Sequence, residues 1–302
     1  MKHVGSYRSL WETGELEKRQ AAAWDRLIDC DLCGHRCRVN RLAGETGICR
    51  ADDTVQVSSF GAHFGEEGPL VGTRGSGTIF FTGCNLKCVF CQNWDISQMR
   101  MGRTLSDAEL AKIMISLQKA GCHNINLVTP THYVPQILKA LILACEKGLR
   151  LPLVYNCGGY ESLTTLEILD GVIDIYMPDV KYAHSESALR FSKAKDYPTV
   201  VKSALKEMHR QVGDLMVDDS GIAWRGLLVR HLVLPEGLAG TEEIMGFIAD
   251  EISKDTYINI MDQYRPEYRA GEHPPLNRRI TSHEYKEAVR MARNAGLHRF
   301  AR

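Results

Sequence analysis

The sequence predicts an α/β protein built on a parallel sheet. From residue 78 onward, short runs rich in β-branched and aromatic residues alternate with amphipathic helices that have recognisable ends. The predicted strands cover residues 78–81, 124–128, 151–155, 173–177, 227–234 and 257–260. Six strands that alternate with helices indicate a parallel sheet, either doubly wound or partly closed into a barrel.

The helices between these strands carry start and stop signals. Ser106 and Glu109 have the spacing of a capping box. Pro135 suits the first turn of the following helix, and another apolar helical face stops at Gly213. Thr241 is expected to cap the helix buried before the last predicted strand.

Composition narrows the class of protein. The chain has 302 residues with 37 Lys+Arg and 37 Asp+Glu, so its balanced charge does not suggest a nucleic-acid-binding surface. Its amino terminus lacks a signal peptide's apolar core, and no run is apolar enough to predict a membrane span. Ten cysteines without an export signal indicate thiols, metal or clusters in a reducing cytoplasm.

The most informative motif is Cys84-Asn-Leu-Lys-Cys88-Val-Phe-Cys91, which directly follows the first predicted strand. Three thiolates this close can hold three irons of a 4Fe–4S cluster and leave the fourth iron open. A small molecule can bind there, and S-adenosylmethionine (SAM) can chelate iron through its amino and carboxylate groups. The alternatives are three packed cysteines or a zinc site that lacks one ligand.

This motif resembles the cluster motif of the radical SAM superfamily, and the following Gln-Asn-Trp-Asp resembles the branch of pyruvate formate-lyase activating enzyme. The resemblance covers nearly the whole chain. It implies a partial (β/α)6 barrel of radical SAM type, with the cysteine loop at the carboxyl edge of the sheet. It also implies reductive cleavage of SAM to a 5′-deoxyadenosyl radical, which is oxidoreductase-type chemistry.

The same resemblance implies residues that bind SAM. Phe90 would pack near the adenine, and Asn156 lies in the segment that aligns with an Asp-Thr-Asn-Gly stretch of the relatives. Asp179 and Lys181, in Met-Pro-Asp-Val-Lys, match a segment near the SAM carboxylate, and Arg230 matches an arginine that contacts SAM. Charged groups at the ends of apolar strands also need partners in their own right, although a surface ion pair would satisfy Asp179 and Lys181.

The loop after the second strand departs from the relatives. They place Gly-Gly-Glu there to bind the SAM amino group, whereas this chain has Thr-Pro-Thr131-His132-Tyr. We expect a polar role for Thr131 and His132, with a solvated loop as the alternative for the histidine. His63, Glu66 and Glu67 precede the barrel, and either approach the site from outside it or lie in a solvated loop.

A second cysteine set, Cys30, Cys33, Cys37 and Cys49, lies before the barrel. Its spacing can wrap a tetrahedral metal. Zinc is slightly preferred, a second iron–sulfur cluster is the rival, and reduced thiols are the third alternative. We expect residues 1–74 to form this metal-binding segment with a lead-in, and residues 75–302 to form the radical SAM core with a helical extension.

The absence of export signals predicts a cytoplasmic protein, and the resemblance implies a radical SAM enzyme similar to activating enzymes that takes electrons from a reductant such as flavodoxin or ferredoxin. The analogy gives a glycyl-radical enzyme as substrate, and another peptide or a small molecule is equally allowed. A non-enzymatic iron–sulfur sensor or electron carrier is the alternative of another class.

Overall fold

The computed structural model describes residues 3–301, and within them ten strands form one mixed sheet. Their order is β10-β9-β8-β6-β5-β4-β2-β1-β3, with β7 paired to β8. The bounds are β1 (Val55–His63), β2 (Ser76–Phe81), β3 (Arg103–Leu105), β4 (Ile125–Val128), β5 (Leu153–Cys157), β6 (Ile175–Pro178), β7 (Met216–Val217), β8 (Ala223–Leu232), β9 (Tyr257–Met261) and β10 (Arg299–Phe300).

The six predicted strands are confirmed as β2, β4, β5, β6, β8 and β9, and each pairs in parallel with its neighbour in that order. The fold is therefore a partial (β/α)6 barrel. β1 adds to β2 in the antiparallel direction, so part of the segment before residue 75 belongs to the sheet itself. The expected boundary at residue 74 does not coincide with a break in the sheet.

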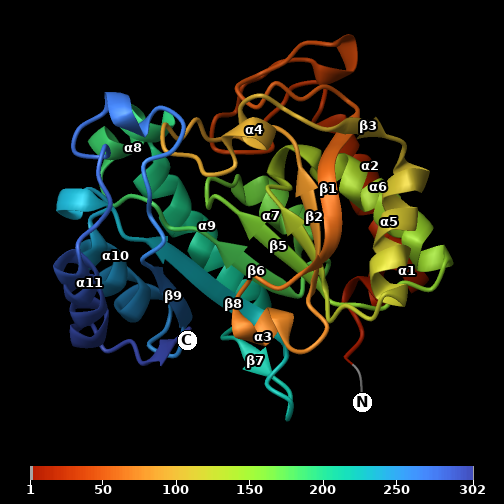
Figure 1. Cartoon of the computed structure of the whole chain (residues 1–302). Coiled ribbons are helices and arrows are strands. Elements are labelled where there is room, and N and C mark those ends of the chain that lie inside the picture. The colour runs from red at the N-terminus through yellow and green to blue at the C-terminus, as the bar shows by residue number, and fades with distance from the viewer. Residues whose placement is uncertain (1–2, 302) are drawn as a thin grey trace.

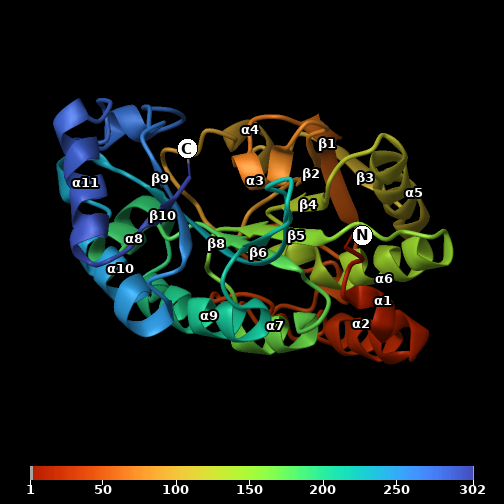
Figure 2. The same ribbon diagram turned by 90° about the horizontal axis from the view of Figure 1, so that it is seen from below.

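Helices cover the sheet unequally (Figure 2). The helices α1, α2, α6, α7 and α9 lie on one side of it, and α3 and α4 lie on the other. The α-helices are α1 (Tyr7–Glu12), α2 (Glu15–Asp25), α3 (Gly68–Val71), α4 (Trp94–Ser97), α5 (Asp107–Lys119), α6 (Val134–Glu146), α7 (Leu163–Leu169), α8 (Ser185–Ser192), α9 (Tyr197–Val212), α10 (Thr241–Phe247) and α11 (Ser282–Asn294). In residues 3–301, none of the helices has the length and apolar character of a membrane span.

The helix ends predicted from the sequence are confirmed, with one exception. Ser106 and Glu109 form the predicted capping box of α5, and Pro135 lies in the first turn of α6. Thr241 is not the N-cap of α10, because Gly240 occupies that position in a left-handed conformation. The Thr241 hydroxyl instead lies 2.9 Å from Nε2 of His231, a buried histidine on β8.

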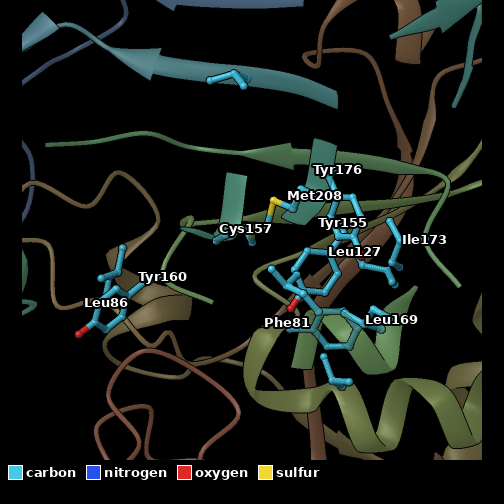
Figure 3. Close-up of a cluster of buried hydrophobic side chains, with 14 of the residues drawn as sticks. Phe81, Leu86, Leu127, Tyr155, Cys157, Tyr160, Leu169, Ile173, Tyr176 and Met208 are labelled. Atoms are coloured by element: carbon cyan, nitrogen blue, oxygen red, sulfur yellow. The ribbon is translucent and has the colours of Figure 1, made fainter. Parts of the chain in front are cut away.

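The two faces of the sheet are buried differently. The main core packs the helices against the sheet, and Figure 3 shows Tyr155, Leu127 and Phe81 gathered there. A smaller core covers the opposite face, where Leu70 of α3 packs with Met177, Leu228 and neighbouring apolar residues. We call the face that α3 covers the inner face. Burial by α3 keeps water from its apolar part.

Candidate active site

The cysteine loop begins where β2 ends, at the loop edge of the barrel. Gly83 has a φ of +77°, a conformation that side chains rarely adopt. A Cβ there would lie 3.0 Å from the carbonyl oxygen of Cys49 and 3.2 Å from Nε2 of His132. The turn into the cysteine motif therefore requires glycine, both for its backbone angles and for close packing.

Each sulfur of the cysteine triad lies within hydrogen-bond reach of a nearby group. The Leu86 N–H donates to Sγ of Cys84 at 3.3 Å, and the Ser192 hydroxyl donates to Sγ of Cys88 at 3.0 Å. Sγ of Cys91 lies 3.1 Å from a serine hydroxyl of α4. Such bonds suit cluster ligands, because hydrogen bonds to the sulfurs help to set the potential of an iron–sulfur cluster.

Burial favours the protonated form of these thiols. It raises the pKa of Cys84 to about 12 and raises the pKa of Cys88. Without a compensating positive charge, both side chains would remain neutral thiols at neutral pH. A bound metal would supply that charge, and three closely spaced thiols are a donor set that fits a 4Fe–4S cluster.

Four predicted residues meet at the carboxyl ends of β5, β6 and β8, and we call Asn156, Asp179, Lys181 and Arg230 the strand-end site. Arg230 donates through Nε to Oδ1 of Asp179 and through Nη2 to Oδ1 of Asn156, both at 2.7 Å. Lys181 donates to Oδ2 of Asp179 at 2.6 Å. The Asp179 carboxylate is thus held between two cations.

Electrostatics keep the strand-end site ionised although it is largely buried. Burial alone would raise the pKa of Asp179, but Arg230 and Lys181 outweigh it and hold that pKa below its usual range. Burial would likewise lower the pKa of Lys181, and the Asp179 carboxylate reverses this. The hydroxyl of Tyr182 lies 2.8 Å from the Ser192 hydroxyl that donates to Sγ of Cys88. Because Tyr182 is next to Lys181 in the chain, the strand-end site adjoins the cysteine loop.

The loop between β1 and α3 reaches the same place. Oε2 of Glu66 lies 3.5 Å from Nη1 of Arg230, and Oε1 of Glu67 accepts from Nδ2 of Asn259 at 2.8 Å. Asn259 pairs with Arg230 in the β8–β9 ladder. Of the two expectations for this segment, solvation holds for His63, which is exposed, whereas Glu66 is half-buried and Glu67 is buried beside the strand-end site.

Phe90 lies in the core beside two tyrosines. Its ring centroid is 5.8 Å from that of Tyr264 and 6.5 Å from that of Tyr182, edge-on in both pairs. Only 4% of the Phe90 surface is exposed. The residue therefore forms part of an aromatic wall directly beside Cys91.

The structure does not bring Thr131 to the strand-end site. The side chain is buried, and its hydroxyl donates to Oε1 of Glu161 at 2.9 Å. The oxygen expected to serve a ligand is therefore used inside the protein. Tyr155 donates to the other oxygen of Glu161, whose pKa burial raises to about 7.

The solvated-loop alternative for His132 is wrong. The ring is 2% exposed, and its Nε2 lies 2.7 Å from the carbonyl oxygen of Thr82, two residues before Cys84.

Two residues of the candidate site, Asn126 and Tyr197, were not predicted from the sequence. Asn126 lies on β4, where the register places it on the same face as Asn156. It is fully buried, and neither its Oδ1 nor its Nδ2 has a hydrogen-bond partner among residues 3–301. Tyr197 of α9 donates to the carbonyl oxygens of Gly158 and Asp179, and so ties two strand ends together. An asparagine inside an apolar strand was a readable signal, whereas the role of Tyr197 depends on packing alone.

The amino-terminal cysteines lie in the loops that follow α2, which Figure 1 places on the same side as α4. These loops dock on the barrel through His35, whose Nε2 lies 2.7 Å from the carbonyl oxygen of Asn85. The backbones of Cys33 and Glu161 also pair in an isolated antiparallel β-bridge. Within residues 3–301, no group of three or more histidine, cysteine, aspartate or glutamate side chains is arranged so that it could hold a metal ion.

Comparisons with known proteins identify the family of this chain. The model of the Radical SAM superfamily matches residues 78–218. Uncharacterized protein MJ0674 of Methanocaldococcus jannaschii is 37% identical over 279 residues, which cover 89% of this chain and 75% of that protein. Uncharacterized protein MJ0808 of the same organism is 23% identical over 303 residues, covering 92% and 82%.

Among solved structures, Streptococcus suis SuiB bound to precursor peptide SuiA aligns with a TM-score of 0.46 and 15% identity. The alignment covers 73% of this chain and 46% of that one, so this chain spans less than half of its length. The family model and the first relative establish the family. The chain belongs to the radical SAM superfamily, whose members are enzymes that use a 4Fe–4S cluster and SAM.

Proposed function

We propose that the strand-end site binds SAM beside a cluster held by Cys84, Cys88 and Cys91, and that the enzyme takes a hydrogen atom from a peptide. The observation that carries this proposal is the contact network of Arg230 with Asp179 and Asn156, next to the cysteine loop. When bound together, such a cluster and SAM supply a 5′-deoxyadenosyl radical that abstracts hydrogen.

The residues of this chain have separate tasks in that arrangement. Arg230 and Lys181 offer cations to the SAM carboxylate, and Asp179 fixes both of them through its two oxygens. Glu66 and Glu67 lie beside these cations, so a ligand that also carries a sulfonium charge would meet carboxyl groups there as well. We place the adenine against the aromatic wall at Phe90.

Buried polar groups without partners on the inner face favour a polar, hydrogen-bonding substrate. Asn126 directs an amide with no partner among residues 3–301 toward this face. Oε2 of Glu67 is also buried without a partner in that part of the chain. A side-chain amide can both donate to and accept from a peptide group, so a peptide backbone would satisfy Asn126. A glycyl-radical enzyme is the specific peptide substrate that the sequence resemblance suggests.

The test is an anaerobic SAM-cleavage assay. The reconstituted enzyme, reduced by dithionite or by a flavodoxin or ferredoxin, should release 5′-deoxyadenosine. A peptide deuterated at the glycine Cα should transfer deuterium to that product. Release without transfer from peptides would leave a radical SAM enzyme with a small-molecule substrate, whereas an intact cluster without release would indicate a redox sensor.

A matched pair of cysteine variants tests the ligand assignment. Cys88→Ala should abolish the SAM-responsive cluster signal and all release of 5′-deoxyadenosine. Cys145→Ala removes another buried thiol, on α6, and should leave both unchanged. Cleavage by Cys88→Ala would contradict the assignment.

A further inference from the structure

The amino-terminal cysteines surround a small closed cavity. Its lining includes all four thiol-bearing residues, Cys30, Cys33, Cys37 and Cys49, together with Arg41 and His132. The cavity measures about 10 Å³. That is room for the centre of about one water-sized sphere, which suits a single ion.

His132 enters this cavity from the barrel, although it lies far from the four cysteines in sequence. Its Nε2 lies 2.7 Å from the carbonyl oxygen of Thr82. A carbonyl oxygen only accepts, so Nε2 carries the ring proton and Nδ1 is left with a lone pair. Nδ1 is buried and has no hydrogen-bond partner among the described residues.

This bonding pattern is typical of a histidine that binds a metal. A ligand histidine almost always donates its other ring N–H to a carbonyl or carboxylate, which fixes the tautomer and orients the ring. A buried lone pair that accepts no hydrogen bond is costly, and coordination of a metal removes that cost. The ring of His132 is therefore preset to bind through Nδ1.

Arg41 supplies the second independent observation. Its side chain is 1% exposed, and Nε and Nη2 both donate to the carbonyl oxygen of Asp52. Nη1 is buried and has no acceptor in residues 3–301. A thiolate at the cavity wall would accept from it.

Charge balance then selects the ligand set. A divalent ion with three thiolates and a neutral imidazole has one negative charge, and the guanidinium of Arg41 neutralises it. Four thiolates around the same ion would leave one uncompensated negative charge in a buried place, which is unfavourable. The remaining cysteine would stay a neutral thiol.

We propose that this cavity is a zinc site whose ligands are Nδ1 of His132 and three of the four thiolates, with Nη1 of Arg41 donating to one of them. Three sulfurs and one nitrogen form an ordinary closed zinc site. The four cysteines line the cavity, and three of their side chains would turn inward to bind the ion.

The site would fasten the amino-terminal loops to the cysteine loop of the barrel. His132 is bonded to Thr82, and the carbonyl oxygen of Cys49 packs against Gly83, the residue before Cys84. Zinc bound by both His132 and the cysteines would therefore stabilise the turn at Gly83 that leads into the active-site cysteines. This role goes beyond the proposed reaction and does not depend on it.

X-ray absorption at the zinc edge tests the proposal on the wild-type protein, purified with its metals. We expect about one zinc per chain with a first shell of three sulfurs near 2.3 Å and one nitrogen near 2.0 Å, the usual bond lengths. A shell of four sulfurs would overturn the role of His132. Absence of zinc beside roughly eight irons would overturn the zinc site as a whole.

Variants supply a second, independent readout. His132→Ala should weaken zinc retention against a competing chelator dye by roughly tenfold or more. His35→Ala is the matched control, because His35 also contacts a backbone carbonyl on the cysteine loop but does not line the cavity. Equal zinc retention by the two variants would contradict the proposal, and the wild-type spectrum decides it if His132→Ala does not fold.

Discussion

Replacement of Arg230 by methionine tests the electrostatic reasoning about the strand-end site. Arg230→Met keeps much of the side-chain volume but removes the cation that Asp179 and Glu66 share. Those two carboxylates have side chains that are 17% and 8% exposed, so water cannot fully replace the guanidinium. Removing one partner of a buried ion pair costs about 3–5 kcal/mol.

The structure places the expected loss at the lower end of that range. Lys181 remains 2.6 Å from the second oxygen of Asp179 and compensates part of its charge. We therefore expect Arg230→Met to lose about 3 kcal/mol of unfolding free energy in urea. SAM affinity should fall roughly tenfold or more, since a lost charge-assisted contact costs about 1.5–3 kcal/mol.

A double-mutant cycle with Asp179→Asn separates the pair from its surroundings. Once the aspartate is neutral, removal of Arg230 leaves a weaker imbalance, so the double variant should lose less than the sum of the single losses. A coupling energy of about 1–3 kcal/mol is expected for groups in direct contact. Additive losses, or a loss below about 1 kcal/mol in Arg230→Met, would refute the reasoning.

Two further predictions concern stability. Burial raises the pKa of Asp174, which accepts from the N–H groups of Ser6 and Leu153, from 3.8 to about 6. The folded state then binds this proton more tightly, so its stabilising contribution is present below pH 3.8 and is lost as the pH rises through 6. Between pH 4 and 7.5, the unfolding free energy of Asp174→Asn should gain up to about 3 kcal/mol relative to the wild type, and a difference independent of pH would contradict this. Gly83→Ala should cost about 1–3 kcal/mol by the same measurement, because of its positive φ and the close Cys49 carbonyl. Gly61→Ala on β1, where a Cβ meets nothing within 4 Å, should cost much less.

Much of the fold could be predicted because its signals are local. The capping box of Ser106 and Glu109 and the β-branched runs of the six parallel strands each span a few consecutive residues. Local backbone preference and side-chain periodicity determine such elements. The prediction for Thr241 failed because its hydroxyl has a tertiary partner in His231, and the glycine before it adopts the cap position.

The candidate site was likewise only partly predictable from the sequence. The Cys84–Cys91 spacing and the charges that end apolar strands at Asp179 and Arg230 were visible in the sequence, because thiolates and charges are costly to bury without a purpose. Which partner each charge meets was not visible. Arg230 meets Asp179 and Asn156 because parallel strands bring their carboxyl ends to one edge, and it meets Glu66 because a distant loop crosses to the inner face.

The sequence by itself determined that strands of a parallel sheet alternate with helices and that a three-cysteine loop follows the first of these strands, since both depend on residues that are neighbours along the chain. Only the tertiary structure decided that Thr131 turns inward to Glu161 and that His132 faces the amino-terminal cysteines. The physical reason is that a polar side chain in a buried loop takes the nearest partner in space. That partner lies 30 residues away for Thr131, and for Nε2 of His132 it is a carbonyl 50 residues away.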